Sequence, residues 1–107
     1  MDIFHKITET IDSYRNDMVD MQVKLCSFPA ISPSSGGEGE TKKAEFLLDF
    51  LKNGGFADIE VINAPHLDSP SGNRPNILAT YKGKNSSKKI WIMTHMDVVP
   101  PGEMAQW

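Results

Sequence analysis

A histidine and an aspartate two residues apart, His95 and Asp97, are the side chains of this sequence best suited to chemistry. They follow the uninterrupted apolar run from Ile90 to Met93 and precede a Pro-Pro-Gly segment. Side chains alternate across a strand, so residues two apart point to the same side, and the imidazole and the carboxylate would leave a sheet together. An imidazole with an acidic partner is the usual arrangement of a metal-binding histidine. The spacing therefore predicts a metal ligand at His95 that is oriented by Asp97.

A second H-x-D triplet, which begins at His66, shows that the spacing alone is weak evidence. His66 lies in a proline- and serine-rich loop with no apolar strand to hold it, whereas His5 is expected on a solvated helix face. A motif carries weight only in its predicted structural setting. His95 could also be a polar residue at a strand end that bonds to Asp97 without any metal. Of the three histidines, we expect only His95 to be a metal ligand.

Two helices are predicted in the first half of the chain. Apolar residues spaced alternately three and four apart from Phe4 to Phe28 predict one long helix that ends before Pro29. We expect its apolar stripe to pack on the domain's own sheet, because the stripe is short for a coiled coil. A loop rich in proline, serine and glycine follows, and a second helix is predicted from about Glu40 to Gly54.

Three strands are predicted in the second half, over residues 56–62, 76–81 and 89–94, with a 13-residue loop between the first two. The short polar turn between the last two strands predicts that they are antiparallel neighbours. The apolar run of the last strand indicates burial on both faces, as in α/β sheets, whose ligands collect at the carboxyl ends of strands. The sequence therefore predicts an α/β fold in which helices pack on a mixed sheet.

Composition excludes several classes of function. One domain is the most that 107 residues allow, and contents of 39% hydrophobic and 23% charged residues are typical of a globular protein. The net charge of −3 provides no basic surface for nucleic acid. No apolar stretch has the length of a membrane span or signal peptide, so we expect a cytoplasmic protein without membrane contact. The only cysteine, Cys26, cannot form an intrachain disulfide and is expected to be a buried, inert thiol.

The last fourteen residues, THMDVVPPGEMAQW, resemble the first metal-binding motif of the co-catalytic zinc exopeptidases and amidohydrolases. This family includes acetylornithine deacetylase, succinyl-diaminopimelate desuccinylase, carboxypeptidase G and aminoacylase. Its motif is H-x-D-V-V-P, often followed by a glycine and a tryptophan, and the matching positions are His95, Asp97, Val98, Val99, Pro100, Gly102 and Trp107. The resemblance implies that His95 ligates one of two divalent metals and that Asp97 is the carboxylate of the catalytic site that orients this imidazole.

The resemblance also implies that residues 1–107 are the amino-terminal portion of a catalytic domain, hence a partial zinc-exopeptidase-like domain. The other ligands, the bridging aspartate, the glutamate base and the lid domain would come from segments beyond this sequence. The implied reaction is hydrolysis of an amide bond in an N-acyl amino acid or short peptide, with two ions of zinc, cobalt or manganese. With one good ligand, this portion alone is expected to bind metal weakly and to be inactive.

The alternative is a non-catalytic α/β interaction module with a structural His-x-Asp. A strand such as Ile90 to Thr94 would then keep an unpaired edge, which natural proteins usually cover. If the portion is soluble alone, we therefore expect it to self-associate as a homodimer by strand pairing. The length of the encoded protein separates the two hypotheses, because roughly 250 or more further residues would fit a catalytic domain with an inserted lid.

Overall fold

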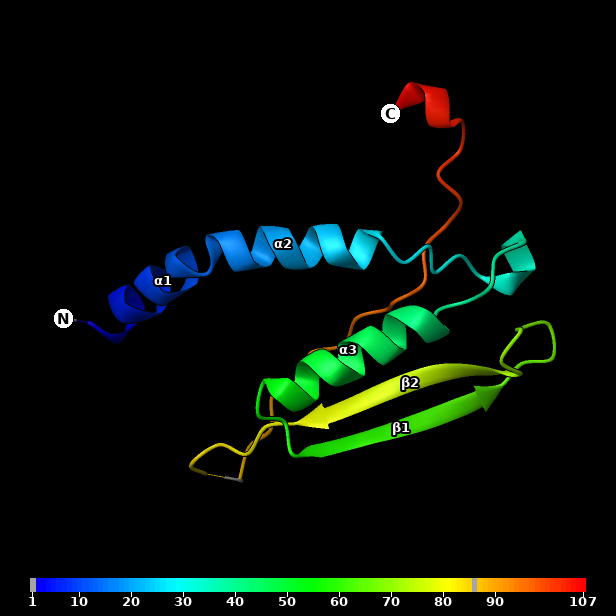
Figure 1. The fold of residues 1–107 in the computed structure, drawn as a ribbon. Coiled ribbons are helices and arrows are strands. Elements are labelled where there is room, and N and C mark those ends of the chain that lie inside the picture. Colours follow the sequence, from blue (N-terminus) through cyan, green and yellow to red (C-terminus); the bar gives the residue numbers. More distant parts are fainter. Residues whose placement is uncertain (1, 86) are drawn as a thin grey trace.

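The computed structural model describes residues 2–85 and 87–107 (Figure 1). Within them the elements are α1 (Ile3–Ser13), α2 (Arg15–Cys26), α3 (Thr41–Asn53), β1 (Asp58–Pro65) and β2 (Asn73–Thr80), with short 3-10 turns at Pro33–Ser35 and Met104–Gln106. Figure 1 shows α3 lying along a hairpin formed by β1 and β2. The fold is of the α/β class, as predicted. None of the helices in the described ranges is long and apolar enough to cross a bilayer.

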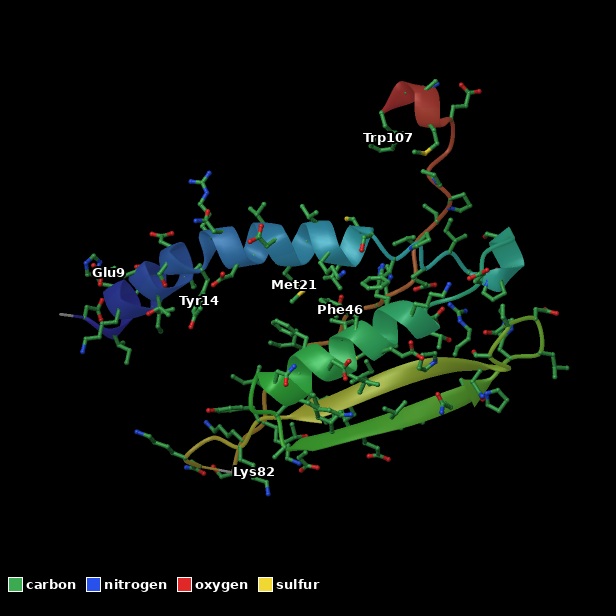
Figure 2. The ribbon with its side chains drawn as sticks, viewed as in Figure 1. Glu9, Tyr14, Met21, Phe46, Lys82 and Trp107 are labelled. Atoms are coloured by element: carbon green, nitrogen blue, oxygen red, sulfur yellow. The ribbon has the colours of Figure 1, made fainter. Side chains whose placement is uncertain are left out.

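The first helix of the sequence prediction is interrupted at Tyr14, which lies at the joint between α1 and α2 (Figure 2). The hydroxyls of Thr10 and Ser13 donate to carbonyls one turn earlier, at 2.7 and 2.6 Å. Such back-bonding loosens and bends helices. The Tyr14 N–H then bonds to the Ile11 carbonyl at 3.0 Å, which is the tighter 3-10 pattern that often ends a helix. The prediction of one continuous helix is therefore wrong at this residue.

The apolar stripe of α1 and α2 does not pack on the sheet, so that prediction is wrong. Of its side chains, those of Phe4, Ile7, Ile11, Tyr14 and Met18 are each more than half exposed, whereas Met21, Leu25 and Phe28 are half-buried. The hairpin is two strands wide, about 10 Å, and one helix is enough to cover a face of that width. The helix that contacts β2 is α3. Just beyond the end of α2, the ring of Phe28 stacks on that of Phe46 in α3, with the ring centroids 5.3 Å apart.

Cys26 provides a related correction. It was expected to be buried, but the structure places it on the exposed surface of the last turn of α2, where the Gln22 amide donates to its sulfur at 3.4 Å. The physical reason is the same as for the stripe, because α2 has little of its surface covered. Figure 2 shows Met21 of α2 and Phe46 of α3 facing one another, and both line an open groove between the two helices.

The sheet is an antiparallel hairpin whose register pairs Asp58 with Thr80 and Pro65 with Asn73. Both strands reach into the segment that was predicted to be a 13-residue loop, which shortens the connection. Among the described residues, the fully buried apolar side chains are the small ones of Ala30 and Ala44. The radius of gyration is 17.0 Å, against about 13 Å for a compact domain of this length. The chain is therefore extended, with a small core under α3.

The third predicted strand is not formed. Residues 89–94 run without a ladder partner in the described part of the chain, and Ile90, Ile92 and Met93 are almost fully exposed. The predicted pairing of this segment with the preceding strand is therefore wrong, and the sheet is antiparallel rather than mixed. An apolar strand of this kind needs other elements to cover both of its faces. The described residues provide no second layer that could cover this segment. Self-association through this segment stays a prediction, because a single chain does not test it.

Candidate functional site

The two residues singled out from the sequence, His95 and Asp97, are in contact. The Nδ1 atom of His95 lies 2.8 Å from the backbone carbonyl oxygen of Asp97 and 3.2 Å from its Oδ1 atom. Both of these oxygens are acceptors, so they favour the proton on Nδ1, which in a neutral imidazole leaves the lone pair on Nε2. The His95 side chain is 83% exposed. A neutral ring held in this way presents Nε2 with its lone pair available to a metal ion.

Asp97 is held from its other side by Arg74, at the start of β2. The Nη2 atom of Arg74 donates to Asp97 Oδ2 at 3.1 Å. The same guanidinium donates to both oxygens of Glu40, from Nε at 2.9 Å and from Nη2 at 3.3 Å. Each carboxylate oxygen of Asp97 thus has its own partner, the imidazole for Oδ1 and the guanidinium for Oδ2.

The charges of this network support one another. Burial acts to raise the pKa of Asp97, but the hydrogen bond and positive charge of Arg74, helped by His95, outweigh it and lower the pKa below its usual value. The hydrogen bonds that Arg74 donates to Glu40 raise the pKa of Arg74 against the opposite effect of burial. Because its folded pKa is lowered, Asp97 contributes stability above the ordinary aspartate pKa and loses it as the pH falls through the lowered value. At neutral pH it is a carboxylate, able to accept a hydrogen bond from the imidazole Nδ1–H.

Backbone contacts on either side of Asp97 fix its segment. The Val98 N–H donates to the Ala30 carbonyl at 2.9 Å, and Val98 forms a parallel bridge with Ile31. The Lys43 ammonium, on α3, donates to the Met96 carbonyl at 3.1 Å. The loop after α2 and the first turns of α3 therefore position the His-x-Asp triplet, in place of the strand that the sequence predicted.

Replacement of Lys43 by methionine tests the tether to Met96. Methionine keeps most of the buried aliphatic length, and the lost hydrogen bond is offset by no longer burying an ammonium, so we expect the free energy of unfolding to change by less than about 1 kcal/mol. The amide of Val98 should nevertheless exchange with solvent faster, as measured by NMR hydrogen exchange. Lys42→Met, at an exposed position paired with Glu38, is the matched control. Equal Val98 exchange in the two variants would contradict a role of Lys43 in holding this segment.

The other two histidines lie elsewhere in the fold. His66 is at the turn of the hairpin, where its backbone N–H donates to the Gly72 carbonyl at 2.9 Å. The ring Nδ1 of His66 is buried without a hydrogen-bond partner among the described residues. His5 is exposed on α1, as predicted, with its Nε2 3.3 Å from Glu9. Across residues 2–85 and 87–107, no three His, Cys, Asp or Glu side chains gather in a way that could hold a metal.

Arg74 and Glu40 are the members of the site that sequence reasoning missed. Glu40 entered the sequence prediction only as the approximate start of the second helix, and Arg74 was left in a loop because the next strand was predicted to start at Asn76. A strand beginning three residues earlier would have placed an arginine inside a partly buried hairpin. Buried charges are rare unless they are paired, so an arginine at that position would have indicated a carboxylate partner for it.

Comparison with known proteins reveals similarity to metallohydrolases and peptidases. The chain is 31% identical over 100 residues to an uncharacterized metallohydrolase of Methanococcus maripaludis, covering 89% of the chain and 24% of that protein. It is 31% identical over 104 residues to a peptidase M20 domain-containing protein of Sordaria macrospora, covering 87% and 22%. It is also 31% identical over 100 residues to a probable carboxypeptidase of Aspergillus flavus, covering 94% and 22%.

The chain therefore spans about a quarter of the length of the curated relatives it matches. No family model and no solved structure matches it. The relatives support a relationship to metal-dependent hydrolases, a class that includes peptidases. They agree with the sequence resemblance at this coarser level and do not separate deacetylases, desuccinylases, carboxypeptidases and aminoacylases from one another.

Proposed function

We propose that this chain contributes His95 as a metal ligand to a metal-dependent hydrolase that cleaves amide bonds. The observation that carries the proposal is the contact of the imidazole, whose Nδ1 faces two acceptor oxygens of Asp97, so that in the neutral ring Nε2 is left for a metal ion. The relatives named as metallohydrolase and peptidase support it. The proposal covers only this chain's part of the site, because the described residues supply fewer than the three protein ligands that a catalytic zinc needs.

The donors present fit a divalent ion as one ligand with its supporting partner. His95 Nε2 would hold the ion, and Asp97 would accept a hydrogen bond from Nδ1–H, which fixes the tautomer and raises the basicity of the ligand. A bound divalent ion supplies Lewis acidity, which activates water and polarises the carbonyl of the substrate. The proton on Nδ1 stays on the side away from the ion throughout. In this proposal the remaining ligands and the general base come from outside the 107 residues.

The finer assignments in the proposal rest on the motif around His95. The site is assigned two ions of zinc, or else of cobalt or manganese. The substrate is assigned as an N-acyl amino acid or a short peptide, and the location of the protein as the cytoplasm. The name of the probable carboxypeptidase of Aspergillus flavus favours peptide substrates within this set. Imidazole binds all three metals, so His95 alone does not select among them.

His95→Ala in the protein at its full encoded length tests the proposal. Zinc content after dialysis, and hydrolysis of N-acetyl amino acids and dipeptides, should fall by more than about 100-fold, since loss of a ligand exceeds the 10- to 100-fold cost of losing an outer partner. His5→Ala is the control, because His5 is exposed on α1 and should leave both values unchanged. Undiminished zinc and turnover in His95→Ala would contradict the proposal. A wild-type protein that binds no zinc would instead favour a structural His-x-Asp.

A further inference from the structure

We propose that Arg74 is a positioning residue of this site, which holds Asp97 against His95 by anchoring it to the buried carboxylate of Glu40. The inference rests on the proposed function for its consequence at the metal, but the positioning itself is a property of the metal-free protein. Its basis is the Arg74 guanidinium of β2, which donates hydrogen bonds to two carboxylates. One is Glu40 at the start of α3, and the other is Asp97 in the segment after residue 94.

The geometry makes Glu40 the fixed end of this connection. Its side chain is 8% exposed, that of Arg74 is 27% exposed and that of Asp97 is 40% exposed, so burial decreases along the chain of contacts toward the site. Arg74 uses Nε and Nη2 on the two oxygens of Glu40, which sets the plane of the guanidinium. A planar fork held at two points directs its remaining donation in a defined direction. Nη2 is therefore presented to Asp97 at a fixed position.

As a consequence, the rotation of the Asp97 carboxylate about its terminal torsion is fixed. The terminal torsion of aspartate has a broad, shallow preference, so a carboxylate with one free oxygen turns readily toward water. With Oδ2 on Arg74, the other oxygen stays 3.2 Å from His95 Nδ1. Without Arg74, the imidazole would keep only the backbone carbonyl at 2.8 Å. Glu40 and Asp97 would then also be two like charges without the cation between them, which disfavours their approach.

A plainer role for Arg74 is to tie β2 to α3 through Glu40, with Asp97 as an incidental neighbour. The two roles differ in what they affect. A tie between elements changes the free energy of unfolding, whereas a positioning residue also changes the tautomer of His95 in molecules that remain folded.

The tautomer can be measured in the metal-free protein at its full encoded length, labelled with 15N-histidine, from long-range proton–nitrogen NMR spectra at neutral pH. Wild type should show the Nδ1–H form of His95. Arg74→Ala should show a mixture of both forms, and its affinity for added Zn²⁺ should fall by about 10- to 100-fold, the usual effect of losing an outer partner. Arg15→Ala removes the same charge from an exposed helix position and should leave the tautomer and the Zn²⁺ affinity unchanged.

Arg74→Lys is the second variant, which keeps the charge and loses the two-pronged geometry. We expect an intermediate tautomer ratio, and this variant decides the question if Arg74→Ala fails to fold. Folded Arg74 variants with the wild-type tautomer and Zn²⁺ affinity, and only a lower free energy of unfolding, would overturn the inference. That outcome is distinct from failure of the proposed function, which is seen as unchanged Zn²⁺ binding in His95→Ala.

Discussion

Gly37→Ala should lower the free energy of unfolding by about 1 to 3 kcal/mol, the usual cost of forcing an extra methyl group into a packed site. A Cβ atom at residue 37 would overlap the carbonyl oxygen of Ile31 and lie 2.5 Å from the Cβ of Ile31. The atom that must move belongs to the backbone, so no side-chain rotation relieves the overlap. That carbonyl accepts the Gly39 N–H at 2.9 Å, and Ile31 forms the bridge to Val98. The strain therefore reaches the segment that holds Asp97.

Urea denaturation followed by circular dichroism measures the loss, and NMR hydrogen exchange at Gly39 and Val98 locates it. Gly83→Ala is the matched control, because among the described residues a Cβ there would meet only the Asn85 carbonyl oxygen, at 3.9 Å. We expect that variant to stay within about 0.5 kcal/mol of wild type. If both variants unfold at the same urea concentration, the close approach of Gly37 to Ile31 has no energetic weight.

Glu40→Ala should cost about 1 to 3 kcal/mol. Removing one partner of a fully buried ion pair costs about 3 to 5 kcal/mol, because the other charge is left without compensation. Arg74 is partly exposed and keeps its bond to Asp97, which reduces the expected loss. Glu40→Gln should cost less than Glu40→Ala, since the amide retains one oxygen acceptor for the guanidinium. Free energies of unfolding from urea titrations provide the comparison.

Glu38→Ala is the control for this pair of variants. Glu38 bonds Lys42 on the exposed surface one turn away, and exposed pairs of this spacing contribute about 0.3 to 0.5 kcal/mol. Both substitutions to alanine remove one carboxylate, so the difference between their losses in the free energy of unfolding measures the effect of burial. Losses of equal size at Glu38 and Glu40 would show that the Arg74 fork is no stronger than a surface contact.

The features that the sequence predicted well are those set by neighbouring residues. The chain leaves its helical conformation before Pro29, and α3 ends at Asn53 ahead of the glycine pair, because proline and glycine act on the backbone next to them. The alternation that predicted strands near Ile59 and Ile77 is likewise a local pattern, and these residues lie in β1 and β2. The contact between His95 and Asp97 also follows from residues two apart.

The features that escaped prediction depend on residues far apart. Whether an apolar segment such as Ile90 to Met93 forms a strand depends on neighbours on both faces, which its own residues do not specify. The bonding of Arg74 to Glu40 and Asp97 joins three distant positions, and no local spacing indicates it. The interruption at Tyr14 arose because hydroxyl groups competed for helix carbonyls, an effect that apolar periodicity does not register.

The bridge between Ile31 and Val98 has a consequence for the order in which the molecule forms. It closes a loop that contains α3 and the whole hairpin. Closing a long loop costs chain entropy before any contact offsets it, so such a closure follows the formation of helices and hairpins from local contacts. His95 and Asp97 are close neighbours in the chain, yet the supports that hold them are recruited only at that late step. Loop-closure entropy therefore predicts that the His-x-Asp segment acquires its supports after the helices and the hairpin have formed.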